Sequence, residues 1–289
     1  QPPLADGQVR ALRLIARRAW GYFETFVTDA DHMLPPDNFQ EDPRPALAHR
    51  TSPTNLGLYL LSIVTARDFG WVGTLDTTER LEATLAAMAR LERFRGHFYN
   101  WYETRDLMPL EPRYVSSVDS GNLAAHLITL ANACDEMATQ QALEPRLSAG
   151  IADGMALLRE SLRTPADVQL DEALGALVAQ LSERPAAPAE LAVHLAALAV
   201  RAAAVEQRTK ELAHEHAGAA SAEAVAWAEA TCRTIASHRR DQEPATHGAE
   251  SLRQRLDSLA TTARAMAAAM RFDFLFDPER KLLSIGYRV

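Results

Sequence analysis

Cysteine is scarce in this sequence: its 289 residues include only Cys134 and Cys232. Both lie in stretches of helix-like composition, so a disulfide framework is not supported and a reducing compartment is the simpler interpretation. A basic excess is also missing, since 30 Lys and Arg residues face 38 Asp and Glu residues and the formal net charge is −8. This balance argues against a nucleic-acid-binding domain, which usually carries clustered basic residues.

Long apolar runs are absent as well. The longest uncharged run, 51–66, ends at Arg67 and falls short of the roughly 18 apolar residues that a membrane-spanning helix needs. The first residues have neither a basic region nor an apolar core, so they do not resemble a signal peptide, and the chain begins without Met. An apolar fraction of 47% is nevertheless typical of a globular protein. We therefore expect a folded segment without a membrane span, cut from a longer protein.

Helical periodicity dominates the first third of the chain. Apolar residues recur at helical spacing from about 9 to 26, which predicts an amphipathic helix. The sequence Thr51-Ser52-Pro53 is typical of a helix start, and Gly70 ends the helix that follows. A third helix is expected over about 74–93. The loop over 29–51 contains four prolines that exclude helix, and ordered loops of this length are often functional.

Two regions near the middle and the end of the chain are predicted to be extended. Aromatic and β-branched residues flank a polar, proline-containing turn over 97–118, which predicts a hairpin or two extended segments. A loop over 119–122 and a new helix from Leu123 follow. Residues 272–289 are typical of a second hairpin, with Asp277-Pro278-Glu279-Arg280 as its turn.

The stretch 144–270 is rich in Ala, Leu, Glu and Arg, which are strong helix formers. Its part 189–238 fits one long helix or two, and we interpret the whole stretch as helical packing or an arm. The expected fold class is therefore all-α. Helical hairpins whose loops converge on one face suit an α/α toroid, but the pattern alone does not separate a toroid from an ordinary helical bundle.

Three polar clusters lie outside the predicted helix interiors. They are 34–42, 49–55, and 99–102 with its continuation 118–122. They combine Asp, Asn, Arg, Gln and Ser with Trp101 and neighbouring tyrosines. Amide, carboxylate and guanidinium groups form the hydrogen bonds that sugar hydroxyls need, and flat aromatic rings suit the apolar faces of pyranoses. This mixture favours carbohydrate binding.

Each cluster also has a purely structural explanation. Asp37 and Asn38 follow two prolines and can shape a turn. Thr51 and Ser52 can cap a helix, and Arg50 can be a solvated charge. The third cluster can cap the helix after it, and its aromatic rings can belong to the core. The joint occurrence of the clusters, rather than any single residue, carries the carbohydrate hypothesis.

Other chemistries have weaker support. The sequence has no Gly-rich phosphate-binding loop and no nucleophile elbow, and neither Cys nor His shows metal-site spacing, so we expect no cofactor and no metal. Hydrolysis of a glycosidic bond needs two carboxylates, and spacing does not choose among six candidates. These are Asp37, Glu41, Asp42, Glu103, Asp106 and Asp119.

Several long motifs together resemble the cyclic β-1,2-glucan synthase family. They are Leu34-Pro-Pro-Asp-Asn-Phe-Gln-Glu-Asp-Pro43, His49-Arg-Thr-Ser-Pro-Thr-Asn55, Arg90-Leu-Glu-Arg-Phe-Arg-Gly-His-Phe-Tyr-Asn-Trp-Tyr102, Tyr114-Val-Ser-Ser-Val-Asp-Ser-Gly-Asn-Leu123 and Phe274-Leu-Phe-Asp-Pro-Glu-Arg280. The resemblance covers about 10–137 and again 272–289. The stretch 144–270 matches only in general helical character.

The resemblance implies a very large inner-membrane enzyme with three activities. A membrane-embedded glucosyltransferase polymerises glucose, a middle glycoamylase-like domain cyclises linear β-1,2-glucan by transglycosylation, and a phosphorylase-like domain trims chain length. This sequence resembles the N-terminal part of the middle domain, an (α/α)6 toroid. We expect 1–143 to form that part, 144–270 to be a helical segment or interdomain arm, and 271–289 to be a β-hairpin after which the domain continues.

The resemblance further implies that the catalytic glutamates lie beyond this sequence, so the segment alone is expected to be inactive, with Asp119 its best catalytic candidate. Expected partners are linear and cyclic β-1,2-glucan and the glucosyltransferase and phosphorylase-like domains of the parent, at the cytoplasmic face of the bacterial inner membrane. The expected substrate-binding residues are Asp37, Asn38, Gln40, Arg50, Thr51, Ser52, Asn55, Tyr99, Asn100, Trp101, Tyr102, Asp119, Ser120 and Asn122.

Two other functions stay open at this point. The segment can be a structural scaffold that contacts other domains of the parent, with 144–270 as the contacting arm. It can also be a β-1,2-glucan hydrolase-like module that uses Asp37 and Asp119.

Overall fold

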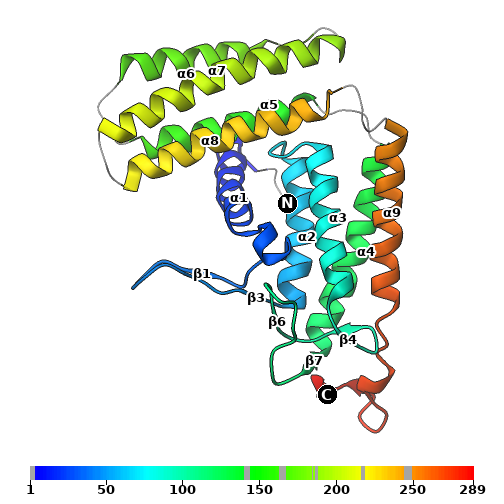
Figure 1. The fold of residues 1–289 in the computed structure, drawn as a ribbon. Helices are drawn as coiled ribbons and strands as arrows, with labels where there is room; N and C mark the ends of the chain where they lie inside the picture. Colours follow the sequence, from blue (N-terminus) through cyan, green and yellow to red (C-terminus); the bar gives the residue numbers. More distant parts are fainter. Residues whose placement is uncertain are drawn as a thin grey trace. The chain divides into compact units, whose positions relative to one another are not determined.

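A computed structural model describes residues 4–139, 144–162, 167–183, 185, 188–215, 219–243 and 249–289. Across these ranges the chain is mainly helical, with only short antiparallel strand pairs (Figure 1). This confirms the expected mostly α-helical class, while the toroid stays a prediction. The described helices are α1 (Asp6–Phe26), α2 (Pro53–Asp68), α3 (Thr74–Arg90), α4 (Ser117–Thr139), α5 (Glu144–Ser161), α6 (Val168–Ser182), α7 (Pro188–Glu215), α8 (Ala219–Arg240) and α9 (Ala249–Ala268), with 3-10 turns η1 (Asp29–Asp31) and η2 (Asp273–Leu275).

Local signals explain where the first helices begin and end. Ser52 precedes α2, and its Oγ accepts a hydrogen bond from the Asn55 amide at 3.2 Å, as an N-cap does. Gly70 follows α2 with a φ of +81°, the left-handed conformation that glycine adopts at helix C-termini. The described residues of 189–238 belong to two helices, α7 and α8.

The strands pair in an order that the sequence analysis did not predict. The pairs are β1 (Phe39–Gln40) with β2 (Ala46–Leu47), β3 (Arg50–Thr51) with β6 (Tyr102–Glu103), β4 (Arg93–Phe94) with β5 (His97–Phe98), β7 (Tyr114–Ser116) with β10 (Gly286–Arg288), and β8 (Phe276–Asp277) with β9 (Leu282–Leu283). The hairpin expected within 272–289 is confirmed as β8–β9. The extended segments expected within 97–118 are present, but β6 pairs with β3 and β7 pairs with β10 rather than with each other.

The predicted loop over 119–122 is wrong. Strand β7 runs directly into α4, which begins at Ser117. The Oγ atom of Ser116 accepts a hydrogen bond from the Asp119 amide at 3.2 Å. This cap starts the helix six residues earlier than expected and places Asp119 in its first turn.

The described chain forms two compact units, each assembled from separate segments. Unit 1 combines the described residues of 1–19, 66–76 and 141–246. Unit 2 combines those of 20–65, 77–140 and 247–289. The sequence analysis instead divides the chain into three consecutive segments, and its first boundary falls at residue 143, which lies outside the described residues.

Unit 1 is built on a sequential stack of helices. Helix α6 packs on α7, α7 on α8, and α8 on α5. Leucines from α5, α6 and α7 fill its core, including Leu158, Leu177 and Leu198, and α8 contributes Ala224, Ala228 and Ile235. The end of α8 also holds the turn between α2 and α3, because the Ser237 Oγ accepts the Gly73 amide at 2.8 Å.

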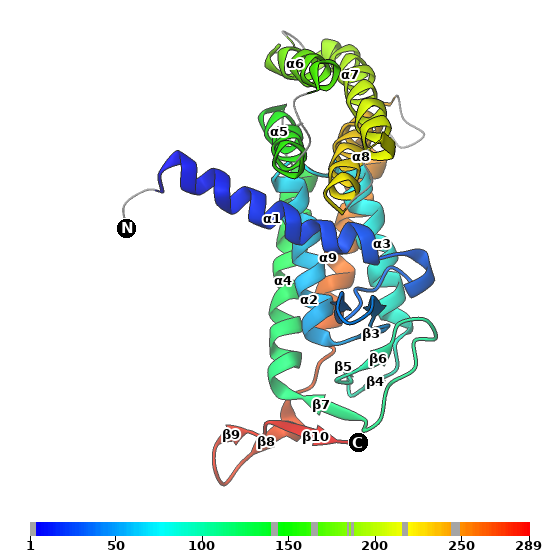
Figure 2. The same ribbon diagram turned by 90° about the vertical axis from the view of Figure 1, so that its left-hand side faces the viewer.

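Unit 2 contains α4 packed along α9, and α2, α3, α4 and α9 run side by side in both ribbon views (Figure 2). Its fully buried side chains come mainly from the inner faces of α2, α3 and α4. They include Leu56, Tyr59, Leu60, Ile63, Leu81, Met88, Leu123 and Leu127. Because these helices form a closely packed support, the loops and strands at their ends can hold polar side chains in fixed positions.

In unit 1, Asp167 caps α6 and is expected to titrate well below the ordinary range. A hydrogen-bonded ion pair with Arg208, followed by the Leu170 amide, lowers the pKa of Asp167 to about 2. Its contribution to stability should therefore be complete above the ordinary value of about 4 and be lost as the pH falls toward 2. Carboxyl ¹³C NMR should show this titration, and Arg208→Gln should return the pKa toward 4. A pKa near 4 in the unsubstituted protein would contradict the ion-pair contribution.

Candidate carbohydrate-binding site

The site is built on the two-stranded ribbon β3–β6 of unit 2. Arg50 pairs with Glu103, and Thr51 pairs with Tyr102. Opposite residues of an antiparallel pair project on the same side, and successive residues alternate. One side of the ribbon therefore carries Arg50 and Glu103, together with Trp101 two positions earlier. The other side carries Thr51 and Tyr102, which are fully buried.

Asp37 is the centre of a polar network on the outer side of this ribbon. Its Oδ2 accepts from Arg50 Nη2 at 2.9 Å and Nε at 3.1 Å. The side-chain Nδ2 of Asn38 donates to the same oxygen at 2.9 Å, and the side-chain Nδ2 of Asn55 donates to Oδ1 of Asp37 at 3.2 Å. The Arg50 guanidinium lies over the Trp101 ring, 4.9 Å from its centroid. These contacts bring residues from a loop, a strand and a helix start into one cluster.

Asp119 joins the same region from α4. Thr54, the neighbour of Asn55 in the first turn of α2, donates a hydrogen bond through Oγ1 to Asp119 Oδ1. Asp37 and Asp119 therefore contact consecutive residues of α2. The structure thus brings together Asp37, Arg50 and Trp101, and it links Asp119 to the same start of α2 through Thr54.

Five of the predicted site residues are buried instead. Ser52 is the N-cap of α2. The Tyr102 hydroxyl donates to the Glu92 carbonyl at 2.6 Å and accepts from the Tyr99 amide at 2.7 Å. Burial is also the main reason that the pKa of Tyr102 is raised. With Thr51 and Ser120, these side chains are at most 6% exposed, so they support the ribbon and the start of α4 from behind.

The other predicted residues lie nearer the surface. Gln40 lies on β1 and Asn122 on α4, and both are exposed. Asn100 is half-buried, and its amide donates to the Tyr114 carbonyl at 2.7 Å. Among the contacts of the described residues, no side-chain hydrogen bond joins Gln40 or Asn122 to the Asp37 network.

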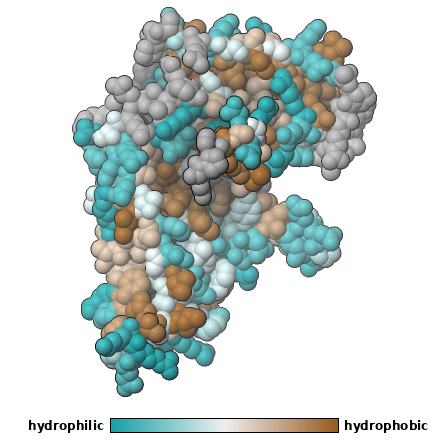
Figure 3. Space-filling view, turned by 180° about the vertical axis from the view of Figure 1, so that it is seen from behind, coloured by the Kyte–Doolittle hydropathy of each residue, from teal (hydrophilic) through white to brown (hydrophobic). Residues whose placement is uncertain are grey.

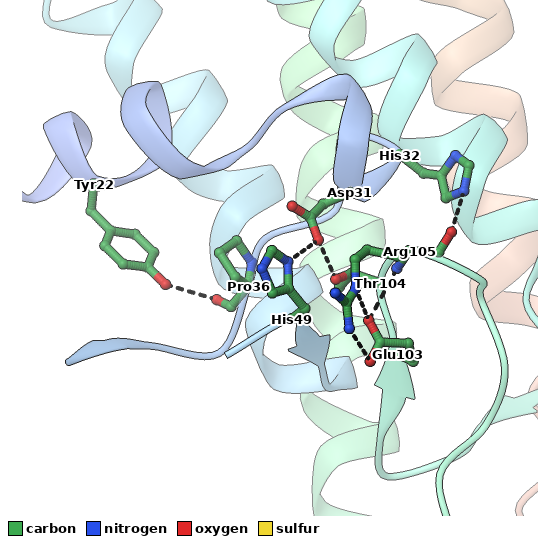
Figure 4. Close-up of polar contacts among 8 residues, drawn as sticks. All are labelled: Tyr22, Asp31, His32, Pro36, His49, Glu103, Thr104 and Arg105. Carbon is green, nitrogen blue, oxygen red and sulfur yellow. Dashed lines mark hydrogen bonds and ion pairs between the residues drawn. The ribbon is translucent and has the colours of Figure 1, made fainter. Parts of the chain in front are cut away.

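A buried hydrogen-bond network centred on Asp31 lies behind the ribbon, and the sequence analysis did not predict it (Figure 4). Asp31 on η1 is 2% exposed, and its Oδ1 accepts from His49 Nδ1 at 2.8 Å and from Thr104 Oγ1 at 2.5 Å. The Thr104 amide also donates to the His49 carbonyl at 3.0 Å. Asp31 therefore fixes both strands of the ribbon to the chain after α1. The clustering of Asp and Pro in this loop was the available signal, but spacing gave no partner.

Glu103 and Arg105 form a second ion pair next to the Asp37 network. We call the side chains of Asp37, Arg50, Trp101, Glu103 and Arg105 the outer row of the ribbon. Arg105 donates through Nε to Oε1 at 2.8 Å and through Nη2 to Oε2 at 3.1 Å. These hydrogen bonds are the largest cause of the lowered pKa of Glu103. Two carboxylates, of Asp37 and Glu103, thus lie beside two guanidinium groups, of Arg50 and Arg105. The row offers many directional donors and acceptors while its formal charges cancel.

Within the described part of the chain, no group of three or more His, Cys, Asp or Glu side chains is arranged to hold a metal ion. None of the helices in that part combines the length and the apolar character needed to cross a bilayer. The face displayed in Figure 3 carries both hydrophilic and hydrophobic residues.

Comparison with known proteins shows what the sequence of this chain is similar to. No protein-family model matches the chain. The chain is 44% identical over 300 aligned positions to the cyclic beta-(1,2)-glucan synthase NdvB of Rhizobium meliloti (strain 1021). The match covers 99% of this chain and 10% of that synthase, so the chain spans about a tenth of the relative's length. The resemblance inferred from the motifs is confirmed, since nearly the whole chain is similar to one segment of that synthase.

Proposed function

We propose that this chain is part of a cyclic β-1,2-glucan synthase and that its β3–β6 ribbon supplies a glucan-binding surface to the domain that cyclises the polymer by transglycosylation. The observation that carries the proposal is the convergence of Asp37, Arg50 and Trp101 on one face of the ribbon. The proposal includes an (α/α)6 toroid completed by other parts of the parent, and a place at the cytoplasmic face of the inner membrane.

The chemistry of the cluster fits a neutral polyhydroxylated ligand. Asp37 and Asn55 offer oxygen and amide partners, and Arg50 offers a rigid fork of donors. Trp101 is only partly buried, so its ring can pack against the apolar face of a sugar. Because the carboxylates and guanidinium groups neutralise one another, the surface does not favour an anionic polymer over an uncharged one.

Asp119 is the chain's best candidate for a group that acts directly on the substrate. Its Oδ1 accepts from Thr54, and a carboxylate has further lone pairs on both oxygens for a sugar hydroxyl. The second carboxylate that bond exchange requires is proposed to come from another part of the parent, so the chain alone is proposed to be inactive.

The binding proposal is tested by Trp101→Ala and Asp119→Ala in the full-length synthase. We expect linear β-1,2-glucan to bind about 3- to 10-fold more weakly to Trp101→Ala, because a stacking ring contributes about 0.5–1.5 kcal/mol. Asp119→Ala should weaken binding about tenfold or more through loss of a charged hydrogen-bond acceptor. Isothermal titration calorimetry provides the affinities.

Asp135→Asn is the matched control for this experiment. Asp135 forms an exposed ion pair with Arg264 between α4 and α9, within the same unit but outside the cluster, so its loss should leave glucan affinity unchanged. Unaltered affinity and cyclisation in both Trp101→Ala and Asp119→Ala would remove the binding surface from the proposal.

A scaffold role is the second candidate, and the separate core of unit 1 favours it. The α5–α8 stack buries its own apolar side chains, as an interdomain arm would. Deleting 185–245 from the synthase distinguishes the two roles: lost cyclisation with intact assembly supports a part in catalysis, whereas lost assembly supports the scaffold.

A further inference from the structure

The outer row of the ribbon continues beyond the cluster already described. Glu103 lies opposite Arg50 in register, and Trp101 precedes it by two positions, about 7 Å along an extended strand. Arg105 follows by two positions and forms a two-pronged ion pair with Glu103. The Trp101 ring and the Glu103 carboxylate therefore lie on one face of the ribbon, and Arg105, in the turn after β6, binds that carboxylate.

The Glu103–Arg105 ion pair contributes little to the stability of the fold. Its partners are two residues apart in the chain, so the ion pair joins no distant elements, and their side chains are 25% and 59% exposed. Exposed ion pairs of this kind contribute little to stability. The attachment of this segment comes instead from Asp31, which binds Thr104 between the two residues, and from His32, whose Nε2 donates to the Arg105 carbonyl at 3.0 Å.

The same attachments hold the pair in a fixed orientation. Since Thr104 is fully buried and bonded to Asp31, the chain is anchored between Glu103 and Arg105. The carboxylate and the guanidinium are also mutually aligned. A preorganised fork of this kind loses little conformational entropy when a ligand binds.

We propose that the Glu103–Arg105 pair is a second sugar subsite, which takes vicinal hydroxyls of the glucosyl residue next to the one held by Arg50 and Trp101. One hydroxyl donates to a Glu103 oxygen, and its neighbour accepts from an Arg105 N–H that the ion pair leaves available. The compensated charges suit an uncharged sugar. This inference rests on the proposed glucan-binding function and extends it along the ribbon.

The test compares linear β-1,2-linked gluco-oligosaccharides of increasing length on the full-length synthase carrying Glu103→Ala or Arg105→Ala. Each substitution should raise the Kd of the disaccharide and of the longer oligosaccharides about tenfold and leave that of glucose, measured alongside, unchanged, because a single glucosyl unit can occupy the Trp101 end alone. Trp101→Ala should weaken every length. Asp135→Asn serves again as the exposed-ion-pair control, and circular dichroism should show that all variants are folded.

The outcomes separate the inference from the function on which it rests. Unchanged affinities for all lengths in Glu103→Ala and Arg105→Ala, while Trp101→Ala weakens binding, would overturn the second subsite and leave the proposed function standing. Failure of the unsubstituted synthase to bind any of the oligosaccharides at this site would overturn both. The affinities should also change little between low and high salt, because the oligosaccharides carry no charge for salt to screen.

Discussion

Replacing Asp153 with alanine is expected to lower the free energy of unfolding of unit 1 by about 3 kcal/mol. Asp153 lies on α5 and is 6% exposed. It accepts hydrogen bonds from Arg13 Nε at 3.2 Å, Arg13 Nη2 at 2.6 Å and Trp71 Nε1 at 2.9 Å. Removing one partner of a buried ion pair typically costs about 3–5 kcal/mol, because the remaining charge is left without compensation.

The lower end of that range applies here because Arg13 keeps other partners. Its Nη2 also donates to the Phe69 carbonyl at 2.9 Å, and its guanidinium lies 4.8 Å from the centre of the Phe69 ring. Trp71, by contrast, loses the acceptor of its indole N–H. An unpaired buried donor costs about 1–3 kcal/mol, so both partners contribute to the expected loss.

Asp153→Asn is the matched control for this experiment. The asparagine carbonyl can still accept from Trp71, so we expect this variant to lose about half as much stability. Urea titrations followed by tryptophan fluorescence report on Trp71 and Trp227, which both lie in unit 1. A loss below about 1 kcal/mol in Asp153→Ala would contradict the view that this carboxylate joins α1, α5 and the turn after α2.

A feature of the fold can be predicted from the sequence when the residues that determine it are close together in the chain. The start of α2 at Ser52 and its end at Gly70 depend on neighbouring residues, and both were predicted. The pairing of β7 with β10 joins residues about 170 positions apart. No local pattern encodes such a partner, because short strands with similar composition can pair with any free edge.

The candidate site follows the same rule. The sequence predicted Asp37, Arg50, Trp101 and Asp119 as site residues by residue type, because polar and aromatic residues outside helix interiors are often functional. It placed Tyr102 in the same group, although the hydroxyl of Tyr102 is used within the fold. A tyrosine that stacks on a ligand and one that braces a strand have the same local pattern, so only tertiary structure separates them.

The β4–β5 turn is a further feature that a local pattern could have revealed. Arg95 and Gly96 separate two pairs of aromatic and polar residues, 93–94 and 97–98. Two-residue hairpin turns that end in glycine are a recognised signal. The β4–β5 turn lies before residue 97, where the predicted extended region begins, so this hairpin was not predicted.

Replacing Gly96 with alanine is the second change expected to have a large effect. The φ angles of Arg95 and Gly96 are +50° and +85°, and a left-handed conformation costs a non-glycine residue roughly 1–2 kcal/mol. A Cβ atom at Gly96 would also lie 1.9 Å from the carbonyl oxygen of Ala269. Since that oxygen belongs to the backbone, the turn has to move, and such overpacking costs roughly 1–3 kcal/mol. We expect a total loss of roughly 2–5 kcal/mol.

Gly121→Ala is the matched control within unit 2. Gly121 lies in α4, and an added Cβ would meet nothing within 4 Å, so its replacement should stabilise the protein by up to about 1 kcal/mol through helix propensity. Thermal and urea unfolding of the two variants should therefore move in opposite directions. Equal stability of Gly96→Ala and the unsubstituted protein would contradict the close approach of the turn to Ala269.

The same substitution should weaken glucan binding, although Gly96 lies outside the proposed surface. The Arg271 amide donates to the Arg95 carbonyl at 3.1 Å and attaches the turn to the chain after α9. The backbone carbonyl of Glu92, just before β4, accepts a hydrogen bond from the hydroxyl of Tyr102 on the ribbon. Displacement of the turn should lengthen that hydrogen bond and make the positions of Trp101 and Glu103 less fixed. Oligosaccharide affinity should therefore fall in Gly96→Ala at temperatures where the variant is still folded, and it should not fall to the same extent in Gly121→Ala.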